Sequence, residues 1–117
     1  MAGLDQELQA IADSTRRRIL RLVRDREVSA GGIADQFPGI SRPSVSQHLR
    51  VLLNAGLLTV RRDGNRRLFR LRSDGLTGAA AFIDDLWGDS LSRLKQAAED
   101  EQSQRDEAQH TSERERS

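Results

Sequence analysis

Four short runs of apolar residues at helical spacing occupy the first half of the chain, and each predicts a helix. The runs cover residues 4–12, 14–25, 30–37 and 42–54. Residues typical of helix ends separate the runs, with candidate N-caps and terminators at Asp13, Ser29, Pro38-Gly39, Ser41 and Gly56. The pattern therefore predicts four consecutive helices, of which the last two are joined by a tight turn.

After Gly56 the apolar period changes from helical to alternating. Residues 57–62 and 66–72 are β-like, with Leu58 and Val60 alternating with polar residues in one segment and Phe69 and Leu71 in the other. Asp63-Gly64 supplies a hairpin turn, here with a somewhat longer loop through Asn65. We expect a β-hairpin directly after the fourth helix.

From residue 74 the helical period returns as one stripe about 28 residues long, or about 42 Å at 1.5 Å per residue. The stripe consists of Leu76, Ala80, Ile83, Trp87, Leu91, Leu94 and Ala98. Residues 103–117 lack an apolar period and are rich in Glu, Arg, Gln and Ser, so they are expected to form a disordered charged tail. Residues 1–102 are then expected to form one domain.

This order, four helices, two strands and a last helix, is that of a winged helix-turn-helix. The fold class is mainly α with a β-hairpin wing. The third and fourth helices form the helix-turn-helix, and the fourth is the candidate recognition helix.

Charge is divided unevenly along the chain. The total of 19 Lys and Arg against 18 Asp and Glu gives a net charge of only +1. Residues 1–72 hold 14 basic and 7 acidic residues, a net of +7, while residues 73–117 hold 5 basic and 11 acidic residues, a net of −6. Such asymmetry indicates that the first part binds a polyanion.

Two groups of side chains fit double-stranded DNA as that polyanion. The outer face of the fourth helix carries hydrogen-bonding side chains that reach base edges or phosphates, and the hairpin carries arginines suited to phosphates and narrow grooves. The candidate DNA-binding residues are Arg42, Ser44, Ser46, Gln47, His48, Arg50, Asn54, Arg61, Arg62, Asn65, Arg66 and Arg67. Alternatively, His48 has only a packing role within the protein, and the charged hairpin arginines only prevent an exposed sheet edge from pairing with other chains.

The long stripe of the last helix exceeds what three short helices can cover, so it predicts pairing with a second subunit. The candidate dimer interface is Leu4, Leu8, Ile11, Leu76, Ala80, Ile83, Trp87, Leu91 and Leu94. Trp87 is its expected anchor.

The composition of the sequence gives little support for a catalytic, metal or cofactor site. The chain has no Cys, no Tyr and two His, so a nucleophile–base set, a thiolate zinc site and a thiol switch are not expected, and neither is a cofactor. Asp84, Asp85 and Asp89 are interpreted as a solvated acidic face rather than a cation site. No apolar run approaches the length of about 20 residues that spans a bilayer, and the start of the chain is not a signal peptide. We expect a cytoplasmic protein without enzyme activity.

Three segments, residues 12–20, 41–58 and 61–71, together resemble the ArsR-type, or arsenic-repressor-like, winged-helix transcriptional regulators. Ser46, His48, Leu49 and Leu52 form the most specific part of the match, which extends over roughly residues 4–98. The resemblance implies a homodimeric bacterial repressor, associated with the nucleoid by its function, that releases its operator on receiving a signal. It assigns the recognition helix to residues 42–54 and the wing to 61–67.

The sequence departs from that family at three points. Ser14 stands where the family usually has Pro, and Gly32 where an acidic residue is common. The Cys and His ligands of the family's metal sensors are missing, since there is no Cys and residues 74–101 contain no His. The effector is thus unidentified, with an organic ligand, a partner protein or the protein's own concentration as candidates. The alternative function is a winged-helix module that binds an acidic protein partner.

Overall fold

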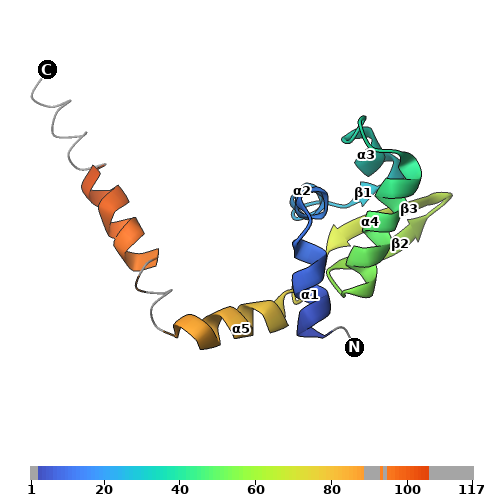
Figure 1. Cartoon of the computed structure of the whole chain (residues 1–117). Helices are drawn as coiled ribbons and strands as arrows, with labels where there is room; N and C mark the ends of the chain where they lie inside the picture. The colour runs from blue at the N-terminus through green and yellow to red at the C-terminus, as the bar shows by residue number, and fades with distance from the viewer. Residues whose placement is uncertain (1–2, 89–92, 94, 106–117) are drawn as a thin grey trace, which may run out of the picture. The chain divides into compact units, whose positions relative to one another are not determined.

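The computed structural model describes residues 3–88, 93 and 95–105. The chain divides after Ala80 into two compact units. The first unit holds all of the elements before the last helix, and that helix begins in the first unit and continues in the second (Figure 1).

The observed elements confirm a winged helix-turn-helix. In chain order they are α1 (Leu4–Ile11), α2 (Ser14–Leu22), β1 (Val28–Ser29), α3 (Ala30–Asp35), α4 (Arg42–Asn54), β2 (Leu58–Asp63), β3 (Arg66–Leu71) and α5 (Thr77–Trp87). The two-residue strand β1 was not expected, because two residues carry no readable period.

Side-chain caps begin three of the helices at the residues that the sequence indicated. Asp13 accepts a hydrogen bond from the backbone N–H of Arg16, Ser29 from that of Gly32, and Ser41 from that of Ser44. Each cap satisfies one N–H that a first helical turn leaves without a partner. Gly56 follows α4 with a φ of 77°, as expected of the residue that ends a helix.

The second helix is shorter than predicted. It was expected to reach residue 25 and ends at Leu22, with Val23 as its C-cap. The backbone N–H of Leu71, at the end of β3, donates to the carbonyl oxygen of Val23 at 2.9 Å. The carbonyl oxygen of Val23 is thus hydrogen-bonded to β3 at the point where α2 ends.

The three strands form an antiparallel sheet in the order β1-β3-β2. Asp63 pairs with Arg66, so the hairpin loop is two residues long, with Gly64 at a φ of 63°, and the longer loop that we expected is wrong. The expected alternation is also incomplete. Val60 is 43% exposed although it shares a face with the buried Phe69, whereas Leu68 is buried although it lies on the other face.

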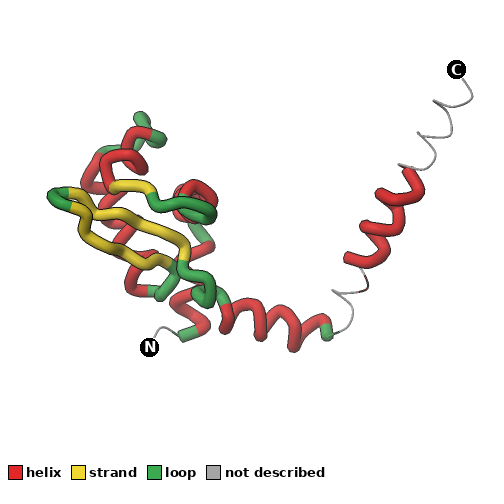
Figure 2. The backbone as a smooth tube through the Cα atoms, turned by 180° about the vertical axis from the view of Figure 1, so that it is seen from behind, coloured by secondary structure: helices red, strands yellow, loops and turns green. Residues whose placement is uncertain are grey.

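Helices α2, α3 and α4 cover one face of this sheet, and Figure 2 shows the sheet from its other side. The core between these layers contains residues from every element of the helix-turn-helix and the sheet. Its fully buried large side chains are Ile19, Val23, Ile33, Val45, Leu52, Leu57 and Phe69.

The end of the chain differs from the single long helix that was predicted. Gly88 has a φ of 49° and a turn follows Trp87, so an uninterrupted stripe through Ala98 is wrong at Gly88. Residues 95–105 are helical, including 103–105, which were expected to begin a disordered tail. Good helix formers in this stretch, such as Gln, Ala and Glu, account for that difference. Residues 106–117 lie outside the described residues.

Candidate nucleic-acid interface

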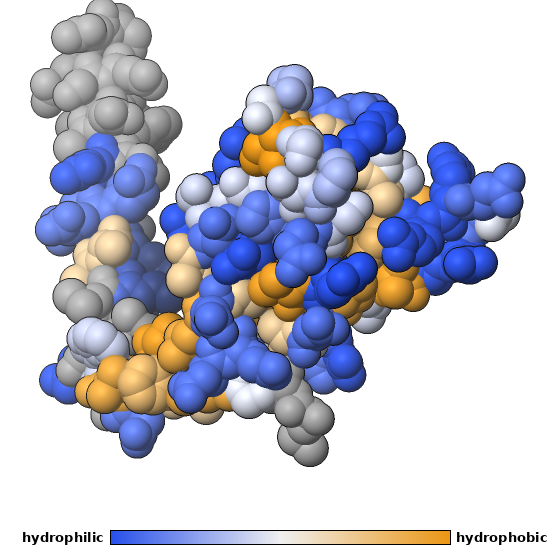
Figure 3. All heavy atoms as spheres, turned by 45° about the vertical axis from the view of Figure 1, so that its right-hand side comes forward, coloured by the Kyte–Doolittle hydropathy of each residue, from blue (hydrophilic) through white to orange (hydrophobic). Residues whose placement is uncertain are grey.

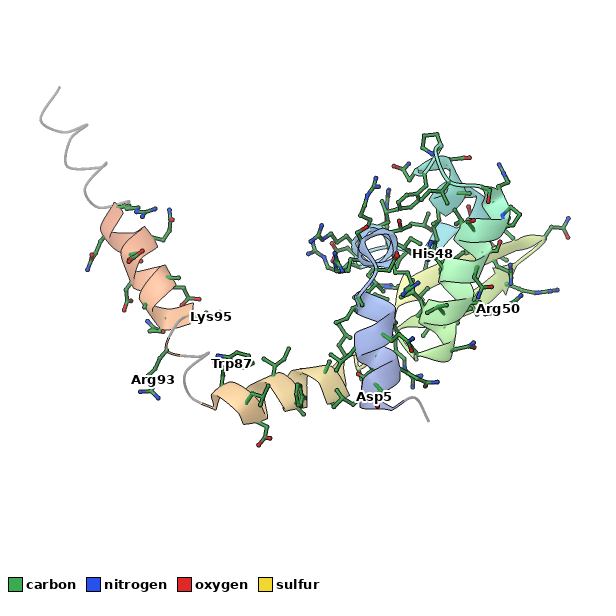
Figure 4. The ribbon with its side chains drawn as sticks, in the orientation of Figure 1. Asp5, His48, Arg50, Trp87, Arg93 and Lys95 are labelled. Carbon is green, nitrogen blue, oxygen red and sulfur yellow. The ribbon has the colours of Figure 1, made fainter. Side chains whose placement is uncertain are left out.

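The outer face of α4 presents a row of polar side chains. Val45, Leu49 and Leu52 anchor the helix in the core. On the opposite side, five of the candidate side chains are exposed: Ser44, Ser46, Gln47, Arg50 and Asn54. Arg50 points away from the protein (Figure 4). The helix therefore offers hydrogen-bonding groups along one side that nothing in the first unit covers.

The start of α4 is fixed by local bonds. The Oγ atom of Ser41 accepts from the backbone N–H of Ser44 at 3.2 Å and donates to its Oγ at 2.9 Å. Arg42 lies 3.7 Å from the carboxylate of Asp35 in α3, an exposed ion pair that joins the two helices of the helix-turn-helix. Pro43 occupies the first turn, where its missing N–H costs nothing.

The hairpin sorts its arginines onto two faces of the sheet. The pair Arg62 and Arg67 lies two positions along the strands from the pair Val60 and Phe69. Both arginines therefore share the face of the buried Phe69. This is the face on which α4 packs, because Phe69 and the anchor residues of α4 belong to one core cluster. Arg61 and Arg66 project from the opposite face, since neighbouring side chains of a strand alternate.

Near the hairpin tip the two faces differ in how their arginines are neutralised, although Arg70, further along β3 on the face of Arg61 and Arg66, also has no carboxylate partner in the described chain. Nε of Arg61 donates to Oε2 of Glu27 at 2.6 Å, and this hydrogen bond raises the pKa of Arg61 above its ordinary value. Arg66 lies 3.5 Å from Asp63. By contrast, across the described part of the chain no carboxylate lies within ion-pair distance of Arg62 or Arg67. The face on the side of α4 therefore carries two uncompensated positive charges.

Arg67 also packs over an aromatic ring. Its guanidinium carbon lies 5.8 Å from the centroid of Phe69. The hydrophilic end of the hairpin protrudes from the body, as Figure 3 shows. Asn65 lies in the exposed two-residue turn at this end. The charged groups thus stand clear of the core on a short, well-paired ribbon.

His48 lies on the side of α4 that faces α2 (Figure 4). Its Nδ1 atom is 3.3 Å from Nη1 of Arg16 and 3.9 Å from Oδ2 of Asp13. The hydrogen bond from the backbone N–H of Arg16 holds the pKa of the Asp13 carboxyl below its usual value. Unlike the other candidates of α4, His48 is half-buried, with 21% of its side chain exposed.

The candidate interface residues fall into two groups by exposure. Leu4, Leu8 and Ile11 of α1 are half-buried, and Leu76 packs against the core of the first unit. Ile83 and Trp87 of α5 are 38% and 50% exposed, and Ala80 is exposed as well. Leu91 and Leu94 lie outside the described residues.

Two exposed apolar residues of α5 were missed by the sequence reading. Phe82 and Leu86 are 40% and 58% exposed and lie next to Ile83 and Trp87, so four large apolar side chains share one side of the helix. The signal in the sequence is that Phe82 and Leu86 are four residues apart, as are Ile83 and Trp87 in the predicted stripe. Arg16 was also missed as the partner of His48, because 32 residues separate the two in sequence.

The described residues, 3–88, 93 and 95–105, contain no group of three His, Cys, Asp or Glu placed to hold a metal ion. In the same residues no helix is long and apolar enough to cross a membrane.

Comparison with known proteins gives consistent matches. A helix-turn-helix domain family matches residues 11–61. The chain is 37% identical over 97 residues to the HTH-type transcriptional regulator Rv2034 of Mycobacterium tuberculosis, covering 83% of this chain and 90% of that protein. It is 32% identical over 79 residues to the arsenical resistance operon repressor of Staphylococcus aureus, covering 68% of each.

A solved structure gives the same picture of the fold. It is the homodimeric winged helix-turn-helix DNA-binding domain of Mb0332 from Mycobacterium bovis, a possible ArsR-family transcriptional regulator. The TM-score is 0.57 and the sequence identity 25%, with 74% of this chain and 80% of the other covered.

Proposed function

Because this chain belongs to the ArsR family of winged helix-turn-helix transcriptional regulators, we propose that it represses transcription as a homodimer bound to an inverted-repeat operator. One observation carries the proposal. The exposed polar face of α4 and the uncompensated pair Arg62 and Arg67 lie on the same side of the sheet. The polar face of α4 and these two arginines together fit a major groove and the phosphates beside it.

Within this proposal the residues divide by what they contact. Gln47 suits the N6 and N7 atoms of adenine, and Arg50 suits O6 and N7 of guanine, so these two carry base preference. Ser44, Ser46 and Asn54 add further polar contacts, while Arg42 meets phosphates near the start of α4. Arg62 and Arg67 bind the backbone or minor groove beside the wing, with Asn65 at its tip. Arg61 and Arg66 contribute less, and so does Arg42, because each already has a carboxylate partner.

The apolar surfaces of α1 and α5 support dimerisation. The four exposed side chains of α5, Phe82, Ile83, Leu86 and Trp87, are costly to leave in water and are suited to burial against a second copy. Leu4, Leu8 and Ile11 extend the same role to α1. We assign DNA binding and dimerisation to residues 1–102 and no DNA contact to the charged segment 103–117.

The proposal specifies binding alone, without catalysis, at the nucleoid in the cytoplasm of a bacterium. The absence of Cys from the chain argues against sensing through thiolate ligands. The family match makes the alternative of a module for acidic protein partners the weaker candidate.

Selection of bound DNA from a random pool, with purified protein, tests the proposal. We expect an inverted repeat whose half-sites lie about 34–36 Å apart, one helical turn. Arg50→Ala should relax base preference, whereas Arg67→Ala should weaken binding to all sequences alike. Recovery of no preferred sequence near physiological salt would refute sequence-specific regulation and favour the protein-interaction alternative.

A further inference from the structure

Arg16 is held in place by three acceptors on two other elements. Its Nε donates to the carbonyl oxygen of Ala10 at 2.8 Å, and its Nη2 donates to that of Gln9 at 3.0 Å. Its Nη1 lies 3.3 Å from Nδ1 of His48 in α4. Because the last carbonyls of a helix lack partners within the helix, the two carbonyl bonds both cap α1 and fix the orientation of the guanidinium.

The contact with Arg16 favours one of the two neutral tautomers of His48. A guanidinium has only N–H donors and stays protonated in proteins. Nδ1 of His48 must therefore be the acceptor of the Arg16 contact, and in the neutral ring the proton resides on Nε2. Asp13, 3.9 Å from Nδ1, adds a negative charge beside the same guanidinium.

The protonated Nε2 faces outward. In the described part of the chain, Oε1 of Glu7 is the one fully enclosed side-chain nitrogen or oxygen that lacks a hydrogen-bond partner. Among the described residues no group bonds to Nε2 of His48, and this atom is not one of the fully enclosed polar atoms that lack a partner, so it reaches solvent. His48 follows Gln47 by about 100° around the helix, on the flank it shares with the exposed Ser44. When a helix lies in a major groove about 12 Å wide, its flanks face the phosphate strands.

From these contacts we propose that His48 donates a hydrogen bond from Nε2 to a DNA phosphate, and that Arg16 is the positioning residue that holds His48 in the Nε2–H tautomer. This inference rests on the proposed function, because it concerns the same DNA surface. It adds a residue of α2, which does not touch the DNA, to those that determine affinity.

Two substitutions at His48 separate the two ring nitrogens. His48→Asn places a polar group near the position of Nδ1 and keeps a partner for Arg16, but it removes the Nε2 donor. His48→Gln instead places an amide N–H near the position of Nε2. Measured by fluorescence anisotropy on the selected operator, His48→Asn should weaken binding about tenfold or more, the loss of one hydrogen bond to a charged group. His48→Gln should stay within about threefold of the unmodified protein.

Substitution of Arg16 tests its role as the positioning residue. Long-range ¹H–¹⁵N spectra of the full-length protein should show Nε2 protonated and Nδ1 unprotonated at a pH where the ring is neutral. Arg16→Met should give a mixture of tautomers and weaken operator binding, while Arg16→Lys, which keeps one donor, should restore part of both. In a His48→Gln background, Arg16→Met should no longer change affinity, which a purely structural role for Arg16 would not produce.

Several outcomes would overturn the proposal. Equal operator affinities for His48→Asn and His48→Gln would exclude the Nε2 contact, and a proton on Nδ1 would exclude the tautomer. If Arg50→Ala still relaxed base preference in either case, the proposed function would stand and only the role of His48 would fail. If the unmodified protein selected no DNA sequence, the proposed function itself would fail, while the tautomer could still be measured.

Discussion

The sorting of the wing arginines leads to a prediction with opposite signs for DNA affinity and for stability. The perturbation is the double substitution Arg62→Gln with Arg67→Gln, and the matched control is Arg61→Gln with Arg66→Gln. Both variants remove two positive charges from the same hairpin. Long-range attraction of DNA to the protein therefore falls equally in both, and any difference reports which face meets phosphate.

The salt dependence of binding supplies the magnitude. Each phosphate contact contributes about 0.9 to the slope of log K against log salt, so loss of two contacts lowers the slope by about 1.8 per protomer. For two protomers on one operator the change is about 3.6, or about two decades of affinity between 50 and 200 mM salt. The control should change the slope by much less, because Glu27 and Asp63 already neutralise its arginines.

Stability should respond in the opposite direction. Arg62 and Arg67 are directly opposed like charges in the register of β2 and β3, an arrangement that costs roughly 0.2–1 kcal/mol. Removing both relieves this repulsion but also removes the cation–π contact of Arg67 with Phe69, so the free energy of unfolding should rise by less than that amount. The control breaks the exposed pairs of Arg61 and Arg66, and should lower the melting temperature slightly.

Anisotropy titrations at four salt concentrations and thermal unfolding of the same four proteins (unmodified, double variant, control and the quadruple variant) measure both quantities. Equal slopes for the double variant and the control would refute the division of the wing into a bound and a neutralised face. A lower slope in the control alone would mean that DNA approaches the side of the sheet away from α4.

Three further predictions concern stability and assembly. Ile83→Glu on the exposed side of α5 should lower the dimer fraction in analytical ultracentrifugation, and an unchanged dimer would place the interface elsewhere. Asp13→Ala should cost about 1 kcal/mol in urea unfolding at pH 7 through loss of the α2 cap. The hydrogen bond from Arg16 lowers the pKa of Asp13 in the folded state, so the ionised cap stabilises the protein above the unfolded pKa of about 3.9 and this stabilisation is lost as the pH falls below that value. The destabilisation caused by Asp13→Ala should therefore be smaller at pH 3 than at pH 7, and equal destabilisation at both would contradict this. Gly78→Ala should stabilise by less than the roughly 1 kcal/mol by which alanine favours helices, because its Cβ would push Oε2 of the buried Glu7 aside. In a Glu7→Ala background the same change should give the larger gain, and additive effects in this double-mutant cycle would dismiss the contact.

The recognition helix could be predicted closely because its signals are local. Ser41, Pro43 and Gly56 mark its ends through short-range sterics and capping, and the apolar residues Val45, Leu49 and Leu52 follow one helical period. The side of α4 that faces away from the core can be predicted without knowing any contact between residues far apart in the sequence. The exposed candidates on that side follow directly from the same period.

The contacts that refine the site depend on distant pairings and could not be predicted in this way. Glu27 neutralises Arg61 only because β1 brings the segment before Val28 alongside β3, and a two-residue strand has no period to read. Likewise, Arg16 meets His48 only after α2 and α4 pack together. Six arginines in the hairpin region look equivalent in sequence, and the sheet register makes them unequal.

Net charge is therefore a poor measure of what a polyanion would meet on this protein. The value of +7 for residues 1–72 counts Arg61 and Arg66, whose carboxylate partners lie within 3.5 Å, equally with Arg62 and Arg67, which have none in the described chain. Arg16 is counted too, although α1 carbonyls and His48 occupy its donors. Because a carboxylate already neutralises Arg61 and Arg66, a phosphate that binds there meets less net positive charge than it does at an unpaired arginine. Near the tip of the wing the unpaired arginines lie on the side of α4, whereas Arg70 lies on the other face further along β3, also without a carboxylate partner among the described residues. The orientation of this protein on DNA therefore depends on where the unpaired arginines lie rather than on the total.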